Sequence, residues 1–406
     1  MELRPTLSTL LRHKTAALLI VLEIALSCAI ICNAIFLIAS RLERIRRPSG
    51  LAESEIVFTQ VTGIGADTDA AARARADVAA LRAIPGVKAV ASINQIPYAG
   101  SSWNSGVRLK EDQGTPNLNA ATYMGDEQLI ETYGLKLIAG RDFTAGEYVD
   151  LDSLNRPGAN VPIPATIVTK AFAEKLFPGE NAIGKSFYSW GDSPIRIVGI
   201  VESLLRPNDQ GWPQDQAHYA MIFPVRISQG WYALRADPAQ RESVKKAVVD
   251  TLTRVDPNRL FDRQDLLSTM RDEYYGRDRS VAWLLVIVCV GLLIITAFGI
   301  GGLASFWVQQ RTKHIGVRRA LGATRGQILR YFQTENFMLA TLGIALGMLG
   351  AFGLNQVMMR LYELPRLPVM YLPIGALTLW LLGQIAVYGP ARRAAAVPPA
   401  VATRSV

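Results

Sequence analysis

The chain has 406 residues, 50% of them hydrophobic, and a formal net charge of +9 at pH 7. A basic balance of this size is typical of nucleic-acid-binding proteins, but much of the excess lies beside long apolar segments, where membrane topology and anionic lipid explain it. We therefore expect membrane lipid, and no nucleic acid, among the partners of the chain.

Four long segments of the chain contain almost no charged residue. Residues 15–40 contain one, Glu23, and residues 280–310, 336–359 and 367–391 contain none. A helix needs roughly 20 apolar residues to cross a bilayer, and each segment is longer than that. The predicted fold class is a membrane protein, with an α-helical four-span domain laid out one plus three and a large α+β extracytoplasmic domain between the first two spans.

The short segments outside the spans predict the orientation, because Lys and Arg are retained on the cytoplasmic side. The N-terminal segment 1–14, the connection 311–335 and the tail 392–406 are all basic, and four spans place them on one side. The outer loop 360–366 is short and nearly neutral. Both termini are therefore predicted to be cytoplasmic. The first span is also too long for a cleaved signal peptide, whose apolar core is about 7–15 residues, so it should remain as an anchor.

One cluster of charges opposes this orientation. Arg41, Arg44, Arg46 and Arg47 directly follow the first span. They open a long domain, however, and the charge rule applies only weakly to long domains. We keep the prediction that this outer domain, residues 41–279, lies outside the cytoplasm.

The outer domain has a mixed pattern of strands and helices. Strands are expected at 55–61, 87–96, 135–139, 186–190, 195–201, 219–225 and 230–235, and helices at 68–83, 126–133, 169–176, 237–254 and 262–279. Asp237 is expected to cap its helix, with Pro238 at the first helical position. Residues 101–125 lack periodicity and should cross between subdomains. The charged helix 262–279 has no breaker before the second span except Gly276, so the two predict a stalk of roughly 70 Å.

The reactive side chains do not form a recognisable catalytic or metal site. Cys28, Cys32 and Cys289 all lie inside spans, so the outer domain should contain no disulfide. The three histidines lie in separate regions. We expect no catalytic residue and no metal ligand in this chain.

A phosphate-loop pattern occurs in the outer domain, because Gly179–Ser186 fits GxxxxGKS. Phosphate binding needs a strand, then the loop, then a helix whose first amides face the phosphates. Here a predicted helix precedes the pattern and an aromatic strand follows it. We interpret the segment as a helix-to-strand turn and expect no ATP hydrolysis by this chain alone.

We call the connection 311–335 the basic connection, and its sequence contains signals for two helices. A basic helix should end at Gly322, and a second helix should begin after Thr324, with Gln327 completing a capping box. The first helix carries apolar Ile315 and Leu321 beside Arg318 and Arg319. Such a helix suits a groove on another protein or a layer of lipid head groups, and the residues alone leave both open.

The basic connection also resembles the signature of the MacB/FtsX-type permease family of ABC transporters. In that family a run R-(T/R)-x-E-I-G-x-R-(R/K)-A-(L/I)-G-A forms the coupling helix that docks on the ATPase. The matching residues are Arg311, Ile315, Gly316, Arg318, Arg319, Ala320, Leu321, Gly322 and Ala323. His314 stands where the family usually has Glu, which inverts the local charge. The runs 139–143, 176–179, 197–201 and 390–395 are similar to family positions too.

The resemblance implies a non-catalytic permease subunit in a bacterial inner membrane, with its large domain periplasmic. Two separate ATPase chains would bind ATP and Mg, the permease would pair with a second copy or a paralogue, and this chain would need no cofactor. The outer domain would divide into a β-α-β part near both of its ends and an inserted part at about 105–225. ATP-driven movement would pass outward as a mechanical stroke, for export of a drug, peptide or lipid-linked substrate, with a periplasmic adaptor and an outer-membrane channel as further partners.

Two other classes of function compete with this prediction. A membrane-anchored receptor or mechanotransmitter would regulate an extracytoplasmic partner without transport, but three closely spaced C-terminal spans exceed what an anchor needs. A membrane enzyme would require paired catalytic groups, which the sequence does not offer.

Small and polar residues in the spans predict helix contacts. Gly343, Gly347, Ala351 and Asn355 recur every four residues in the third span, which favours close packing within one subunit or at a dimer seam. Glu23 is costly in lipid and should face the protein interior, paired with a polar group such as Asn33 or with a neighbouring subunit.

Overall fold

The structure is a computed structural model, which describes residues 14–64, 69–156, 161–362 and 366–398. The chain divides into two compact units. We call Arg47–Arg277 the globular unit and the remaining described residues the helical unit.

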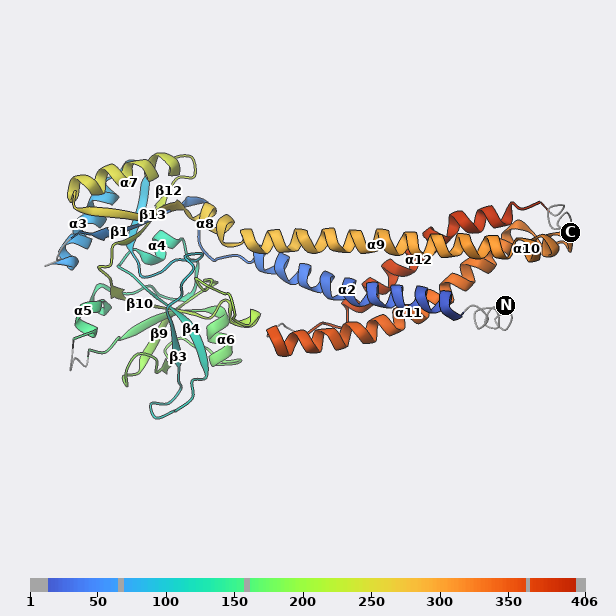
Figure 1. The fold of residues 1–406 in the computed structure, drawn as a ribbon. Helices are drawn as coiled ribbons and strands as arrows, with labels where there is room; N and C mark the ends of the chain where they lie inside the picture. The colour runs from blue at the N-terminus through green and yellow to red at the C-terminus, as the bar shows by residue number, and fades with distance from the viewer. Residues whose placement is uncertain (1–13, 65–68, 157–160, 363–365, 399–406) are drawn as a thin grey trace. The chain divides into compact units, whose positions relative to one another are not determined.

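The helical unit is built from α-helices, drawn in Figure 1. They are α2 (Lys14–Arg46), α9 (Gly276–Gln310, whose first two residues belong to the globular unit), α10 (Thr312–Ala320), α11 (Arg325–Tyr362) and α12 (Tyr371–Ala395). Within the described residues, four of these helices are long and apolar enough to cross a membrane, and each overlaps one predicted span. The helices extend beyond the uncharged segments because polar residues continue them at the ends.

Close packing of α11 on α2 explains the glycines of α11. A Cβ atom at Gly343 would lie 2.9 Å from the Cβ of Ile24, and one at Gly347 would lie 2.5 Å from the Cβ of Cys28. Both distances are below any normal carbon contact. The two helix backbones therefore approach each other at positions where only a hydrogen atom fits.

The first sheet of the globular unit is antiparallel, with strand order β13-β1-β12-β2. Its strands are β1 (Ile56–Gly63), β2 (Val87–Ser92), β12 (Trp231–Ala236) and β13 (Arg259–Leu266). Helix α3 (Ala70–Arg82) connects the first two strands, and α7 (Arg241–Val255) connects the last two. This order is that of a split β-α-β fold, into which all residues between β2 and β12 are inserted. Leu81 of α3 and Val248 of α7 pack in the same core cluster as Leu234 of β12.

Two predictions for this part of the chain need correction. Helix α7 begins at Arg241 rather than after Asp237, because the Gln240 amide donates to the Asp237 carbonyl at 2.9 Å and closes a separate turn. Residues 262–266 are in strand β13 and not in a helix, because they pair with β1 at the sheet edge, where one face meets solvent and accepts charge.

The predicted stalk is also interrupted. Helix α8 (Leu267–Tyr274) ends at Tyr275, and α9 starts at Gly276, the breaker seen in the sequence. The rod is therefore α9 alone, whose 35 residues span about 50 Å at 1.5 Å per residue.

The second sheet is mixed and has strand order β3-β4-β10-β7-β9-β5, with β8 paired to β9. Its strands are β3 (Asn104–Val107), β4 (Leu118–Met124), β5 (Leu137–Gly140), β7 (Ala165–Thr169), β8 (Ser186–Phe187), β9 (Ile195–Val201) and β10 (Ala220–Phe223). Short elements complete this part, namely α4 (Leu129–Tyr133), α5 (Leu151–Leu154), α6 (Lys170–Leu176), the pair β6 (Val149–Asp150) and β11 (Val225–Arg226), and the 3-10 turns Ala145–Glu147 and Gln214–Gln216. A further 3-10 turn, Glu53–Glu55, directly precedes β1. The strands of this sheet lie within residues 104–223, close to the range of about 105–225 that was predicted for the inserted part.

Strands β3 and β4 fall in the segment 101–125, which was predicted to be irregular. Nearly every side chain of β4 is buried, so it lacks the alternation of a half-exposed strand. Strand β3, with the sequence Asn-Ser-Gly-Val, has weak strand propensity and is held by pairing with β4. Local pattern therefore carries no signal for either strand.

Candidate functional site

The basic connection folds as its capping signals predict. Helix α10 ends at a glycine with φ +98°, Gly322, and the Ala323 amide donates to the Arg318 carbonyl at 3.0 Å. Thr324 and Gln327 then form a reciprocal capping box, in which the Gln327 amide donates to Thr324 Oγ1 at 3.3 Å and the Thr324 amide donates to Gln327 Oε1 at 2.9 Å. Helix α11 continues from there without a break. The turn from α10 into α11 is thus defined by backbone geometry and capping hydrogen bonds.

A buried ion pair joins the start of α10 to α11. Arg311 Nη1 donates to both carboxylate oxygens of Glu335, at 2.9 and 3.1 Å, and the guanidinium lies 5.6 Å from the ring centre of Trp307. The Glu335 side chain is 2% exposed and that of Arg311 is 12% exposed. In the sequence, Glu335 stands out only as the first acid after the arginines of the basic connection. Its pairing joins residues 24 apart, which no local pattern predicts.

The two faces of α10 have different surroundings. Ile315 and Gly316 are buried, and Ile315 belongs to the core cluster of the helical unit. Leu321 is 83% exposed and Val317, one turn earlier, is 52% exposed. The expectation that Ile315 meets a partner is therefore wrong, because this side chain anchors α10 to its own unit. Val317, which the sequence did not single out, belongs to the exposed apolar surface instead.

Basic side chains flank this exposed apolar surface. Lys313, His314 and Arg318 are exposed, and Arg318 also lies 5.1 Å from the ring centre of Tyr331. Arg319 and Ala323 are half-buried, while Ala320 and Gly322 are exposed. We define the docking ridge as Val317 and Leu321 together with the flanking Lys313, His314 and Arg318.

The small residues of the third span contact other parts of the same chain. Gly343 and Gly347 face α2, and Ala351 is fully buried, its carbonyl accepting a hydrogen bond from Asn33 Nδ2 at 3.1 Å. Asn355 Oδ1 accepts from the Leu367 amide at 2.9 Å. These contacts account for the four-residue spacing within one subunit.

Glu23 lies on the side of α2 that faces α9. A Cβ atom added at Gly299 would collide with its carboxylate, so the glycine makes room for the acid. One turn later, Ser27 Oγ and Thr296 Oγ1 are 2.8 Å apart. The suggested partner Asn33 donates to backbone carbonyls instead, including that of Ala29 at 2.9 Å. Glu23 is therefore half-buried against α9 and is not paired with Asn33.

Three of the four arginines that opposed the predicted orientation pair with acids. Arg41 and Arg44 of α2 both pair with Asp278 of α9, whose side chain is 7% exposed. Arg47 pairs with Asp209 at 3.3 Å. Neither acid was identified from the sequence, because each is distant along the chain from its arginine.

A cluster of side chains in the globular unit joins the places where the chain enters and leaves it. We call this cluster the clamp, and it consists of Arg47, Glu53, Asp209, Arg271 and Tyr274. Tyr274 donates its hydroxyl to Asp209 Oδ1 at 2.8 Å. Arg271 donates to Glu53 at 2.7 Å and to the Arg47 carbonyl at 2.9 Å. Arg47 directly follows α2 and Tyr274 immediately precedes the break before α9, so the clamp connects both chain crossings to the loop after β9.

We expect Asp209→Asn to loosen the clamp. The Asp209 side chain is 1% exposed, and its replacement leaves the buried guanidinium of Arg47 without an acid, which is strongly unfavourable. Hydrogen exchange of the full chain should become faster, by about tenfold or more, in residues 47–55 and 267–277. Asp150→Asn removes an exposed acid that lies 3.8 Å from Arg226 and serves as the control with no change. Equal exchange in the two variants would argue against the clamp.

The phosphate-loop pattern adopts the predicted helix-to-strand turn. Helix α6 precedes it and strand β8 begins at its last residue. Lys185 pairs with Glu180 and lies 4.7 Å from the ring centre of Phe177, while its amide donates to the Ala182 carbonyl at 3.1 Å. The groups that would cradle a phosphate are thus engaged within the turn.

Because Lys185 is engaged within the turn, Lys185→Ala should leave the rate of ATP hydrolysis unchanged. In a phosphate loop the lysine contacts the β- and γ-phosphates, and its loss would abolish hydrolysis. Here we expect ATP hydrolysis by the purified assembly to stay within about twofold of the wild type, a difference below 0.5 kcal/mol. A severe loss of hydrolysis, with the chain still folded, would show that the turn interpretation is wrong.

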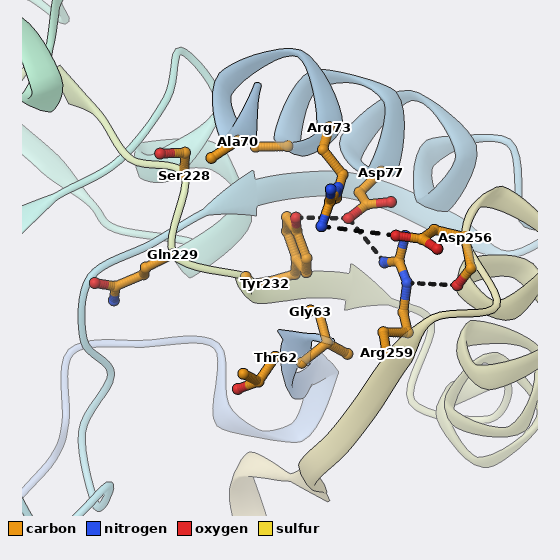
Figure 2. Close-up of a pocket in the computed structure, with 13 residues that line it drawn as sticks. Thr62, Gly63, Ala70, Arg73, Asp77, Ser228, Gln229, Tyr232, Asp256 and Arg259 are labelled. Atoms are coloured by element: carbon orange, nitrogen blue, oxygen red, sulfur yellow. Dashed lines mark hydrogen bonds and ion pairs between the residues drawn. The ribbon is translucent and has the colours of Figure 1, made fainter. Parts of the chain in front are cut away.

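A small pocket of about 170 Å³ lies beside α3, and Figure 2 shows Arg73 and Asp77 of that helix directed toward Arg259. Arg259 Nη1 and the Tyr232 hydroxyl both donate to Asp77 Oδ2, at 2.9 and 2.8 Å. Burial, and next the Asp77 charge, raises the pKa of Tyr232, which keeps the hydroxyl a donor. The side chains of Asp77 and Arg259 are each 2% exposed. We interpret this network as a structural connection that holds α3 against the sheet.

Across the described ranges no group of three or more His, Cys, Asp or Glu residues could hold a metal ion.

Comparisons with known proteins agree on one family. The profile described as FtsX-like permease C-terminal matches residues 286–399, and the one described as MacB-like periplasmic core domain matches residues 18–251. The uncharacterized ABC transporter permease YknZ of Bacillus subtilis strain 168 is 23% identical over 79% of this chain and 78% of YknZ. The macrolide export ATP-binding/permease protein MacB of Acinetobacter baylyi is 25% identical over 96% of this chain, which spans 57% of that MacB. The periplasmic region of MacB from Actinobacillus actinomycetemcomitans matches at 17% identity and a TM-score of 0.35, over 58% of this chain and 97% of that one.

Proposed function

Because this chain belongs to the MacB/FtsX-type permeases of ABC transporters, we propose that a separate ATPase subunit docks on its basic connection and drives a movement of the globular unit. The chain is a multi-pass membrane protein with an α+β domain outside the membrane. Its relatives YknZ and YvrN are named as ABC transporter permeases, so the chain itself is a transmembrane subunit. In the proposal, ATP and Mg bind to the partner ATPase.

The docking ridge is the observation that carries this proposal. Val317 and Leu321 lie one helical turn apart and are exposed on a segment that is not part of any span. Exposed apolar residues surrounded by polar ones mark protein contact sites. Lys313 and Arg318 add positive charge around them and His314 adds a polar imidazole, which suits a partner groove with an apolar floor and an acidic rim.

Internal contacts of the helical unit support the transmission of a movement from this site. The first turn of α10 is attached to the spans at both of its ends. Arg311 pairs with Glu335, and Ile315 packs in the apolar core of the helical unit. A displacement of α10 therefore moves α9 and α11 instead of bending a loose loop. Helix α9 continues unbroken to Gly276, next to the clamp residue Tyr274 along the chain.

For the setting of the protein we propose the inner membrane of a bacterium, with both termini cytoplasmic and the globular unit periplasmic. The basic connection and the basic residues Arg392 and Arg393 after the fourth span support this orientation. The pairing of Arg41 and Arg44 with Asp278 offsets part of the contrary charge after the first span.

The proposed use is export of a drug, peptide or lipid-linked substrate. The MacB relatives are named for macrolide export, and a dimer with a second copy or a paralogue, a periplasmic adaptor and an outer-membrane channel would complete such a machine. These partners are part of the proposal.

Purification in mild detergent tests the proposal. An affinity-tagged chain should retain a soluble chain that carries nucleotide-binding motifs, identified by mass spectrometry, and ATP hydrolysis should accompany the complex. A membrane-anchored receptor would retain no such chain. Recovery of the folded permease without any ATPase, from cells that express the neighbouring genes, would contradict the proposed function.

A further inference from the structure

The globular unit contains a second and larger pocket, of about 610 Å³, between α3 and the turn before α4, together with β6, α5 and β11. We call it the α3 cleft. It lies where the split β-α-β part meets the inserted part, because α3 belongs to the first and α5 and β11 belong to the second. Pockets for small molecules have volumes of about 300–1,000 Å³ and often occur between substructures. The size of the cleft is therefore that of a ligand site.

The α3 wall of the cleft combines apolar and positive side chains. Ala71, Arg75, Val78, Ala79 and Arg82 recur at intervals of three and four residues, so they lie on one side of the helix. Arg75 and Arg82 are exposed. Unlike Arg73 on the neighbouring face, which pairs with Asp256, neither makes an ion pair with any residue that the structure describes. Two guanidiniums thus face an apolar-floored cleft with their donors available.

Most charged side chains on the opposite wall already have a partner. Arg226 donates to Glu127 at 2.5 Å and lies 3.8 Å from Asp150 and 5.3 Å from the ring centre of Tyr148. Its charge is therefore satisfied by the two acids beside it. Ile227 and Leu151 add apolar surface between these polar groups.

The carboxylate of Asp126, the innermost acid of that wall, also has hydrogen-bond partners. Its carboxylate accepts from the Ser92 amide at 2.9 Å and the Gln128 amide at 3.2 Å. Burial raises its pKa to about 6, which the amides and Arg82 only partly oppose. Asp152, at the rim, is exposed and is the remaining acid. The charged side chains of the cleft without an ion pair or a backbone hydrogen bond are therefore Arg75, Arg82 and the exposed Asp152.

We propose that the α3 cleft binds an amphipathic organic anion, whose apolar part packs against Val78 and Ile227 and whose anionic group pairs with Arg75 and Arg82. A guanidinium donates two parallel hydrogen bonds to a carboxylate, sulfate or phosphate, so two such groups select an anion over a cation with the same tail. The site does not depend on the proposed ATPase, and its binding is measured without nucleotide.

Protection of an introduced thiol tests the proposal on the full chain in phosphatidylcholine nanodiscs. Ala79 lines the cleft and is exposed, and the native cysteines lie in the spans, so Ala79→Cys gives a site-specific target for a membrane-impermeant thiol reagent. Dodecanoate should slow this labelling at least fivefold, while dodecyltrimethylammonium at the same concentration should not. Labelling of Lys246→Cys, on the exposed side of α7, should be unchanged by either probe.

Charge reversal gives the matched comparison. In the Ala79→Cys background, Arg75→Glu with Arg82→Glu should raise the dodecanoate concentration for half-protection about tenfold or more, equivalent to 1.4 kcal/mol. Lys175→Glu with Lys246→Glu changes the net charge equally at exposed positions outside the cleft and should have no effect. Equal protection by the cation, no protection by dodecanoate, or equal effects of the two charge reversals would each overturn the proposal.

Discussion

Leu321→Glu is expected to abolish ATP hydrolysis stimulated by the permease while the chain still inserts and folds. Leu321 is 83% exposed, so the folded chain loses no internal packing when it is replaced. In the proposed complex the same side chain is buried in a partner groove, where an unpaired carboxylate costs several kcal/mol. A hot-spot residue of this kind is worth about 2 kcal/mol or more, so binding should fall by at least about thirtyfold. Co-purification of the ATPase and the rate of ATP hydrolysis are the measurements.

Two further variants separate docking from folding in that experiment. Leu321→Met keeps an apolar side chain of similar size and should retain both binding and hydrolysis. Ile315→Glu places the charge on the opposite, buried face of α10 and should instead lower the yield and thermal stability of the chain itself. If Leu321→Glu leaves hydrolysis and co-purification unchanged, the ATPase docks elsewhere.

Glu335→Ala should have the largest effect on the stability of the helical unit. It leaves Arg311, 12% exposed, without its acid, and the loss of one partner from a buried pair costs about 3–5 kcal/mol. We expect a clearly lower unfolding temperature of the purified chain in mild detergent, followed by tryptophan fluorescence. Trp307 lies against the Arg311 guanidinium and so provides a local reporter.

The double substitution Arg311→Met with Glu335→Met distinguishes stability from transmission. Apolar side chains of similar volume often replace a buried pair without loss of stability, so the double variant should unfold near the wild-type temperature. It lacks, however, the directional link between α10 and α11. We expect it to bind the ATPase but to show reduced coupling of hydrolysis to exchange at the clamp. A double variant as unstable as Glu335→Ala would mean that the pair is required for packing, and normal coupling would remove the pair from the proposed mechanism.

The sequence predicts the spans and the caps of the basic connection correctly for a physical reason. A span is defined by about 20 apolar residues in a row, which is a local property. Gly322, Thr324 and Gln327 likewise act on backbone groups within a few residues of themselves. Such signals do not depend on the rest of the fold. The same holds for α3 and α6, whose caps Asp69 and Thr169 accept hydrogen bonds from amides three residues on.

Predictions that depend on distant partners were less successful. Residues 262–266 form a strand because β1 lies beside them. Strand β3 forms because it pairs with β4, and β4 also pairs with β10. The docking ridge shows the same limit, since the family signature includes both Ile315 and Leu321, but only the packing of α10 reveals which one is exposed.

The sequence by itself determined the four spans, the turns of the basic connection and the family, because apolar length, capping and a run of matching residues are all local along the chain. Only the tertiary structure decided that Glu335 neutralises Arg311, that Asp278 neutralises Arg41 and Arg44, and that α3 borders a cleft with two unpaired arginines. The energy of a charge depends on which groups surround it, and folding brings those groups together from distant positions.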